Sequence, residues 1–125
     1  MTPAPKVLLL ESDSALRTAL EFSLTLDGIA VEAFASDEEI VARAPSAAAD
    51  CLVLDYRGDV TNPLAVMTVL RRQGVSLPAI VLATYPSREL EADIEAAGAL
   101  LIEKPLMCDA LADAVRACLD RREAA

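Results

Sequence analysis

Residues 51–55 read Cys-Leu-Val-Leu-Asp, four apolar side chains followed by an acid. A short apolar run of this kind is typical of a strand that is buried on both faces of a parallel sheet. Because ligands gather at the carboxyl ends of parallel strands, we expect the polar residues that end such runs to converge in space. Three further runs have the same form: 7–10 before Glu11, 80–83 before Thr84, and 100–102 before Glu103 and Lys104.

The composition indicates one folded domain with an aliphatic core. The chain has 125 residues, near the commonest domain size, and 54% of them are hydrophobic. It contains two phenylalanines, two tyrosines and no tryptophan, so we expect a core of Ala, Leu, Val and Ile. We predict a single domain over residues 1–125, with its folded part at about 6–121.

Charge and residue usage exclude several classes of function. A formal net charge of −9 argues against nonspecific binding to nucleic acid or to an anionic membrane. No apolar stretch approaches the ~20 residues of a membrane span, and no signal peptide opens the chain, so we expect a cytoplasmic protein. The sequence lacks histidine, the commonest transition-metal ligand. Cys51, Cys108 and Cys118 have no paired spacing and are predicted to be reduced thiols.

Helical patterns lie between the predicted strands, so the two kinds of element alternate. Ser36 followed by Glu39 is a capping-box pattern, and Gly28, Gly74 and Gly98 stand where helices are expected to end. Close alternation of this kind predicts right-handed crossovers and a parallel sheet. We expect strands at 7–10, 29–34, 51–55, 77–84 and 99–103, and helices at about 14–27, 37–44, 64–73, 87–97 and 106–123.

The order and spacing of the strand ends resemble the receiver domain of bacterial two-component response regulators. The resemblance spans about residues 6–121 and rests on Glu11, Asp55, Thr84 and the pair Lys104-Pro105. It implies a flavodoxin-like, doubly wound α/β sheet of five strands and five helices in the strand order 2-1-3-4-5. It also implies a signalling domain rather than an enzyme. The family precedent for the Lys104–Pro105 bond is cis.

The resemblance assigns a role to each strand end. Asp55 would accept a phosphoryl group, Thr84 would donate a hydrogen bond to a phosphoryl oxygen, and Lys104 would pair with the phosphate. Glu11, Asp55 and the backbone carbonyl of Arg57 would bind Mg²⁺. Taken singly, the acid, the threonine and the lysine also fit ordinary structural roles, so the assignment depends on their occurring together.

The chain departs from the family where the metal would bind. Receivers usually carry two adjacent acids after the first strand, whereas here Glu11 is followed by Ser12. A neutral hydroxyl is a weaker Mg²⁺ ligand than a carboxylate, so we expect weak Mg²⁺ binding. Asp13 could substitute through water, but the residue types favour Asp13 as the N-cap of the first helix.

Two further departures concern the surroundings of the acceptor. Tyr85 follows the threonine, where the family usually has a small residue, and we expect Tyr85 to narrow access to Asp55. Leu101 stands nearest the place of an aromatic that swings inward on phosphorylation in the family. The relay from Thr84 to the outer surface is therefore expected to differ from the usual one.

Three hypotheses for function follow. The first is a receiver that accepts a phosphoryl group on Asp55 from a sensor histidine kinase or phosphotransfer protein. No DNA-binding segment follows the last predicted helix, so unless the chain is a fragment of a longer regulator we expect its output to be a protein partner on the face formed by the fourth and fifth helices and the fifth strand. The second, suggested by Ser12, Tyr85 and Leu101, is a degenerate receiver that acts as a phosphorylation-independent interaction module. The third is an enzyme or cofactor carrier of the same architecture, for which histidine ligands are lacking and flavin-stacking aromatics are few.

Overall fold

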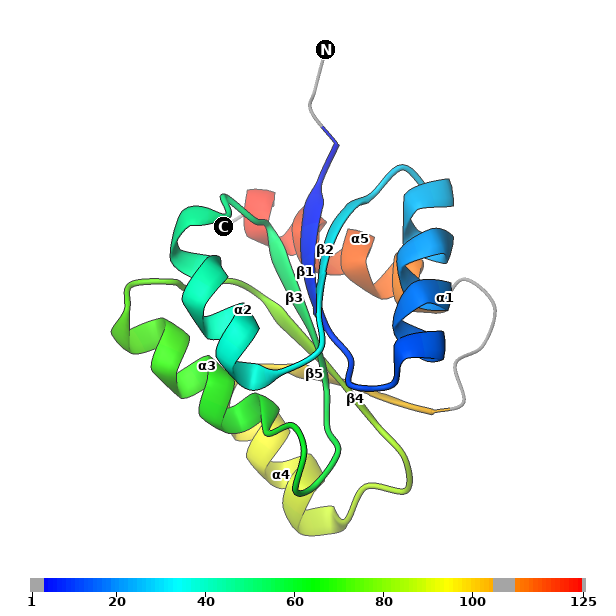
Figure 1. Ribbon diagram of the computed structural model, residues 1–125. Coiled ribbons are helices and arrows are strands. Elements are labelled where there is room, and N and C mark those ends of the chain that lie inside the picture. The colour runs from blue at the N-terminus through cyan, green and yellow to red at the C-terminus, as the bar shows by residue number, and fades with distance from the viewer. Residues whose placement is uncertain (1–3, 105–109, 125) are drawn as a thin grey trace.

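Five parallel strands form one sheet in the order β2-β1-β3-β4-β5, and a helix follows each strand (Figure 1). This arrangement, seen in a computed structural model that describes residues 4–104 and 110–124, confirms the predicted fold class and strand order. The elements are β1 (Lys6–Leu10), α1 (Ser14–Leu26), β2 (Ala30–Phe34), α2 (Asp37–Arg43), a 3₁₀ turn (Ala44–Ser46), β3 (Cys51–Asp55), α3 (Pro63–Arg72), β4 (Ala79–Ala83), α4 (Arg88–Ala96), β5 (Leu100–Glu103) and α5 (Ala110–Ala124).

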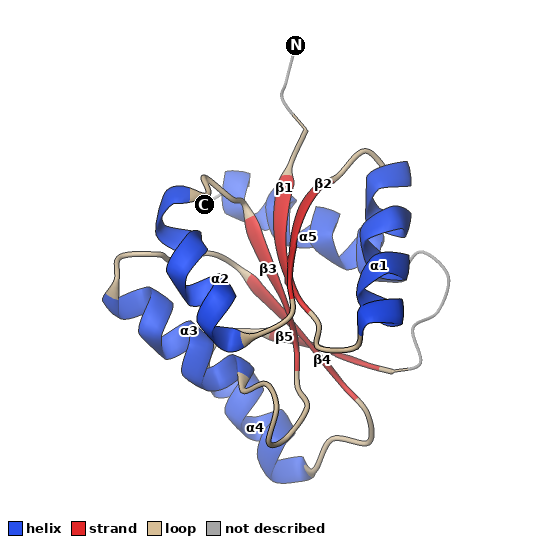
Figure 2. Cartoon of the chain, viewed as in Figure 1, coloured by secondary structure: helices blue, strands red, loops and turns tan. Residues whose placement is uncertain are grey.

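Helices cover both faces of the sheet, as Figure 2 shows: α1 and α5 lie on one face, and α2, α3 and α4 lie on the other. Alternate residues of β1 therefore point into two separate clusters. Val7 and Leu9 pack in the cluster under α1 and α5, whereas Leu8 and Leu10 pack in the cluster under α2 and α3. None of the helices in the described ranges is long and apolar enough to cross a membrane.

Helix starts coincide with the capping residues of the sequence. Ser36 is the N-cap of α2, and its side chain accepts a hydrogen bond from the N–H group of Glu39. Asp13 is the N-cap of α1, and its side chain accepts from the N–H groups of Ala15 and Leu16. The N-cap role predicted for Asp13 is confirmed, and this role fixes the carboxylate beside the end of β1.

Element bounds differ from the prediction mainly at prolines. Strand β4 begins after Pro78, not at Leu77, because proline has no N–H group to donate to the neighbouring strand. Helix α3 begins at Pro63, inside the predicted loop, because Asn62 caps it and proline suits the first helical position. Three residues with sequence-based predictions lie outside the described ranges: Pro105, Leu106 and Cys108.

The two-sided burial of β1 gives a stability prediction. Leu9→Ala is expected to lower the free energy of unfolding by about 2–5 kcal/mol, because it leaves a cavity in a close-packed core. The matched control is Phe22→Ala on α1, where the side chain is 65% exposed, and we expect a change within about 0.5 kcal/mol. Urea unfolding of the two variants measures both values. Equal losses would show that β1 is not buried between two helical layers.

Candidate functional site

Three charged side chains from distant parts of the chain meet at the carboxyl edge of the sheet. The ammonium Nζ of Lys104 lies 2.6 Å from Asp55 Oδ1 and 2.9 Å from Glu11 Oε1. Glu11 directly follows β1, Asp55 is the last residue of β3, and Lys104 directly follows β5. The structure thus brings together three of the four predicted strand-end groups through direct ionic hydrogen bonds.

Backbone hydrogen bonds continue past the strands and hold these residues in place. The N–H group of Glu11 donates to the carbonyl of Phe34 at 3.0 Å, so the pairing of β1 with β2 extends to the acid. The N–H group of Lys104 donates to the carbonyl of Ala83 at 2.8 Å, which extends the pairing of β5 with β4. The backbone of Glu11 and of Lys104 is therefore held by the hydrogen bonds of the sheet, which fixes where each charged side chain begins.

The two carboxylates are buried and share one cation. Glu11 is 0% exposed, Asp55 is 1% exposed, and the side chain of Lys104 is 18% exposed. Asp55 Oδ2 is buried and has no hydrogen-bond partner among the residues that the structure describes. An unpaired buried acceptor costs about 1–3 kcal/mol of stability. The arrangement therefore holds one carboxylate oxygen of Asp55 ready for a ligand.

This environment changes the acid–base properties of the site. Burial raises the pKa of Asp55 to about 6; the hydrogen bond and charge of Lys104 oppose the rise, and the charge of Glu11 adds to it. Burial alone would lower the pKa of Lys104, but its hydrogen bonds to Asp55 and Glu11 raise that pKa above its ordinary value. At neutral pH, Lys104 is thus a fixed cation beside an aspartate that is costly to ionise.

The loop after β3 is tied back onto the site by contacts that sequence reasoning did not identify. The buried hydroxyl of Thr61 donates to the carbonyl of Asp55 at 2.6 Å. The guanidinium Nη1 of Arg57 donates to Ser12 Oγ at 3.2 Å. The carbonyl of Arg57, predicted as a metal ligand, accepts from the N–H group of Val60 at 2.9 Å. No pattern in the single sequence marks these loop contacts, because they depend on how the loop folds back.

A cavity of about 320 Å³ opens above the buried carboxylates. Thr84 lines it from the end of β4, so the fourth predicted strand-end residue also reaches the site. The expectation that Tyr85 narrows the access is wrong: Tyr85 is not among the lining residues and its side chain is 92% exposed. The lining consists of Asp13, Leu16, Asp55, Tyr56, Arg57, Gly58, Thr84 and Lys104.

The donor atoms fit at most a weak site for a divalent cation. Within the described ranges, no group of three or more His, Cys, Asp or Glu side chains is placed to hold a metal. Glu11 Oε1 accepts from Lys104 and Glu11 Oε2 from the N–H group of Asp13, while Asp13 Oδ1 caps α1. Asp55 Oδ2 is thus the carboxylate oxygen that has no partner among the described residues, and Ser12, in place of a second acid, offers only a neutral hydroxyl.

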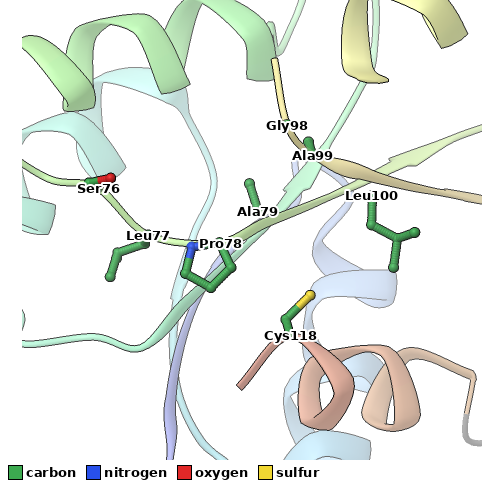
Figure 3. A pocket seen from close by; sticks show the side chains of 8 residues that line it. All are labelled: Ser76, Leu77, Pro78, Ala79, Gly98, Ala99, Leu100 and Cys118. Carbon is green, nitrogen blue, oxygen red and sulfur yellow. The ribbon is translucent and has the colours of Figure 1, made fainter. Parts of the chain in front are cut away.

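A second cavity lies at the opposite edge of the sheet, where β4 and β5 begin. It measures about 460 Å³, and Figure 3 shows Leu77, Pro78, Leu100 and Cys118 among the side chains around it. Its lining contains no charged side chain. The cavity at the carboxyl edge, in contrast, is lined by the charged residues Asp13, Asp55, Arg57 and Lys104.

Comparison with known proteins gives the same class of domain. No protein-family model matches the chain. The chain is 31% identical over 122 residues to the transcriptional regulatory protein PrrA of Mycobacterium leprae, a match that covers 97% of the chain and 52% of PrrA. The chain thus spans about half the length of the curated relatives it matches.

Two solved structures extend the comparison to the fold. The structure named FixJ-N has a TM-score of 0.85 and 25% identity, and the match covers 95% of this chain and 96% of that one. The chemotaxis response regulator CheY4 of Vibrio cholerae has a TM-score of 0.83 and 25% identity, with 93% and 99% coverage.

The sheet order and the lysine-bridged acidic pocket define a flavodoxin-like signalling domain of the two-component class. Together with the sequence and structure matches, they identify the chain as a response regulator receiver domain. Receiver domains are signalling domains and generally not enzymes, and members of this family typically bind Mg²⁺ at the acidic pocket.

The raised pKa of Asp55 predicts a pH-dependent effect of Asp55→Asn. Between about pH 4 and pH 6 the folded state binds a proton on Asp55 more tightly than the unfolded chain, so ionisation lowers stability as the pH rises through this window. Asparagine resembles the protonated acid. We therefore expect Asp55→Asn to be more stable than wild type by about 1–3 kcal/mol at pH 7.5 and equally stable near pH 4.

Urea unfolding at the two pH values in metal-free buffer measures this difference. The matched control is Asp59→Asn, which removes an exposed carboxylate from the same loop and is expected to give no pH-dependent gain. A gain for Asp55→Asn of the same size at both pH values would contradict the raised pKa, and so would a loss at pH 7.5.

Proposed function

We propose that this domain accepts a phosphoryl group on Asp55 from a sensor histidine kinase or a phosphotransfer protein, and signals to a protein partner in the cytoplasm. One observation carries the proposal: Asp55 is buried, its Oδ1 is held by Lys104 at 2.6 Å, and its Oδ2 has no hydrogen-bond partner among the described residues. A nucleophilic carboxylate needs such an arrangement, with one oxygen oriented by a cation and the other able to reach phosphorus.

In the proposed transfer, a bond forms between Asp55 Oδ2 and phosphorus while the bond from phosphorus to the donor atom breaks and the donor keeps the electron pair. Lys104 pairs with the incoming phosphoryl oxygens, and the hydroxyl of Thr84, which lines the same cavity, donates a hydrogen bond to one of them. A bound Mg²⁺ would add further positive charge against these oxygens. The residues that would hold it are Asp55 and, through neutral oxygens, Ser12 and the carbonyl of Arg57, and we propose that they hold it weakly.

The proposed output surface is the face formed by α4, β5 and α5. Thr84 lies directly after β4, in the loop that leads to α4, and Lys104 lies directly after β5. Both of the residues that would bind the phosphoryl group therefore adjoin this face. Leu101, opposite Val81 in the strand register, is partly buried on β5, in place of the aromatic expected in the family. Movement of Thr84 and Lys104 toward a phosphoryl group would alter α4 and β5 at their ends.

Incubation with acetyl phosphate and Mg²⁺ tests the acceptor role. We expect intact-mass measurement to show one added phosphoryl group on the wild-type protein and none on Asp55→Asn. The matched control Asp59→Asn keeps the acceptor and should label as wild type does.

Failure of the wild type to label, under conditions that label another receiver, would reject the proposal. It would leave the phosphorylation-independent interaction module as the alternative. Labelling of Asp55→Asn to the wild-type level would show that another residue is the acceptor.

Ser12, which stands where the family usually has its second acid, gives a separate prediction. Ser12→Asp adds a carboxylate beside Asp55, and we expect it to raise Mg²⁺ affinity about tenfold, since Mg²⁺ prefers charged oxygen ligands. Ser14→Asp, at the exposed first residue of α1, is the matched control and should change the affinity little. Isothermal titration with Mg²⁺ measures both. An unchanged affinity in Ser12→Asp would show that residue 12 does not face the metal position.

A further inference from the structure

Arg57 places a second cation at the acceptor cavity. Its guanidinium reaches from the loop after β3 to the loop after β1, where Nη1 donates to Ser12 Oγ at 3.2 Å. Arg57 lines the same cavity as Asp55 and Lys104. The position of Ser12 is the one where the family usually carries its second acid. A positive side chain therefore contacts the residue that, in the family, is usually an acid that attracts a metal ion.

The charge balance of the site differs accordingly. Three carboxylates against two cations leave a formal charge of −1, whereas an acid in place of Ser12 and a neutral residue in place of Arg57 would leave −3. A less negative pocket attracts a divalent cation less and a phosphoryl group more. The five charged groups are Glu11, Asp13, Asp55, Arg57 and Lys104.

The chemistry of arginine suits this place. The guanidinium stays charged at all relevant pH values and presents its N–H donors in a planar fork that matches phosphate oxygens. Within the described part of the chain, the hydrogen bond from Nη1 to Ser12 is the one that the Arg57 side chain makes. Its other N–H groups are thus open to a phosphoryl group. The carbonyl of Arg57 is meanwhile engaged by the N–H group of Val60.

We propose that Arg57 serves as a built-in cation of the acceptor site, so that Asp55 takes a phosphoryl group without a bound divalent metal. The inference rests on the proposed acceptor function of Asp55. With acetyl phosphate, Asp55 Oδ2 bonds to phosphorus, the bond from phosphorus to the acetate oxygen breaks, and acetate leaves with the electron pair. Arg57 and Lys104 together offset the charge on the phosphoryl oxygens, and the step needs no other reactant.

Labelling with acetyl phosphate in EDTA and in Mg²⁺ tests this role. We expect the wild type to label in EDTA at a rate within about threefold of its rate in Mg²⁺, since Arg57 supplies the offsetting charge. Arg57→Gln should lose about tenfold or more of its rate in EDTA and regain it in Mg²⁺, whereas Arg57→Lys, which keeps the charge, should retain most of the rate. The matched control is Arg72→Gln, an exposed arginine at the far end of α3, and it should behave as wild type.

Wild-type labelling that occurs only in Mg²⁺ would overturn the role of Arg57 and leave the acceptor function of Asp55 intact. Equal rates for wild type and Arg57→Gln in EDTA would also overturn it. These outcomes differ from the failure of the proposed function, which is the lack of labelling in both solutions.

A Mg²⁺ titration gives a readout that does not depend on labelling. Tyr56 lines the cavity and the chain has no tryptophan, so tyrosine fluorescence can report binding. Removal of the positive charge in Arg57→Gln is expected to raise Mg²⁺ affinity about three- to tenfold, and the gain should shrink at high salt. Arg72→Gln should leave the affinity unchanged. An unchanged affinity in Arg57→Gln would overturn the inference, because it would show that the charge of Arg57 does not act at the acceptor cavity.

Discussion

The ammonium of Lys104 between two buried carboxylates is the interaction on which the site depends. It ties the ends of β1, β3 and β5 together, because the ammonium donates hydrogen bonds to a carboxylate oxygen of Glu11 and to one of Asp55. Without this cation, the burial of two charged carboxylates would be strongly destabilising. One ammonium does not fully offset two acids in a buried place, so the pKa of Asp55 still rises to about 6. The sheet thus holds an aspartate whose ionised form would be stabilised by a further positive charge. Bonding of a phosphoryl group to Asp55 would likewise remove the charge from its buried carboxylate.

Much of the fold could be predicted from the sequence because its signals are local. Apolar runs of four residues mark strands buried on both faces, and capping residues such as Asp13 and Ser36 mark helix starts. Parallel strands then require that the residues after them share one edge, which places Asp55 and Lys104 together without any knowledge of their contact. The strand order came from the family resemblance, since alternation alone leaves several orders open.

The features that sequence reasoning missed lie in loops, where direction depends on backbone angles and on distant partners. Tyr85 has a backbone φ of +47° and turns its side chain to solvent, although its bulk next to Thr84 suggested obstruction of the cavity. Arg57 bonds to Ser12 across 45 residues, and Thr61 bonds to the carbonyl of Asp55 across six. The Arg57 contact holds a positive charge at the cavity, and the Thr61 contact restrains the loop after β3.

The most direct test of this account is the pKa of Asp55 itself, followed by the ¹³C chemical shift of its carboxyl carbon in a pH titration. The account predicts a wild-type pKa of about 6 and a further rise in Lys104→Met, because the cation that favours the ionised form is lost. Arg72→Gln, which removes a distant positive charge, should leave the titration unchanged. A wild-type pKa near 4 that does not respond to Lys104→Met would contradict the central claim that Lys104 holds a buried, destabilised carboxylate ready to react.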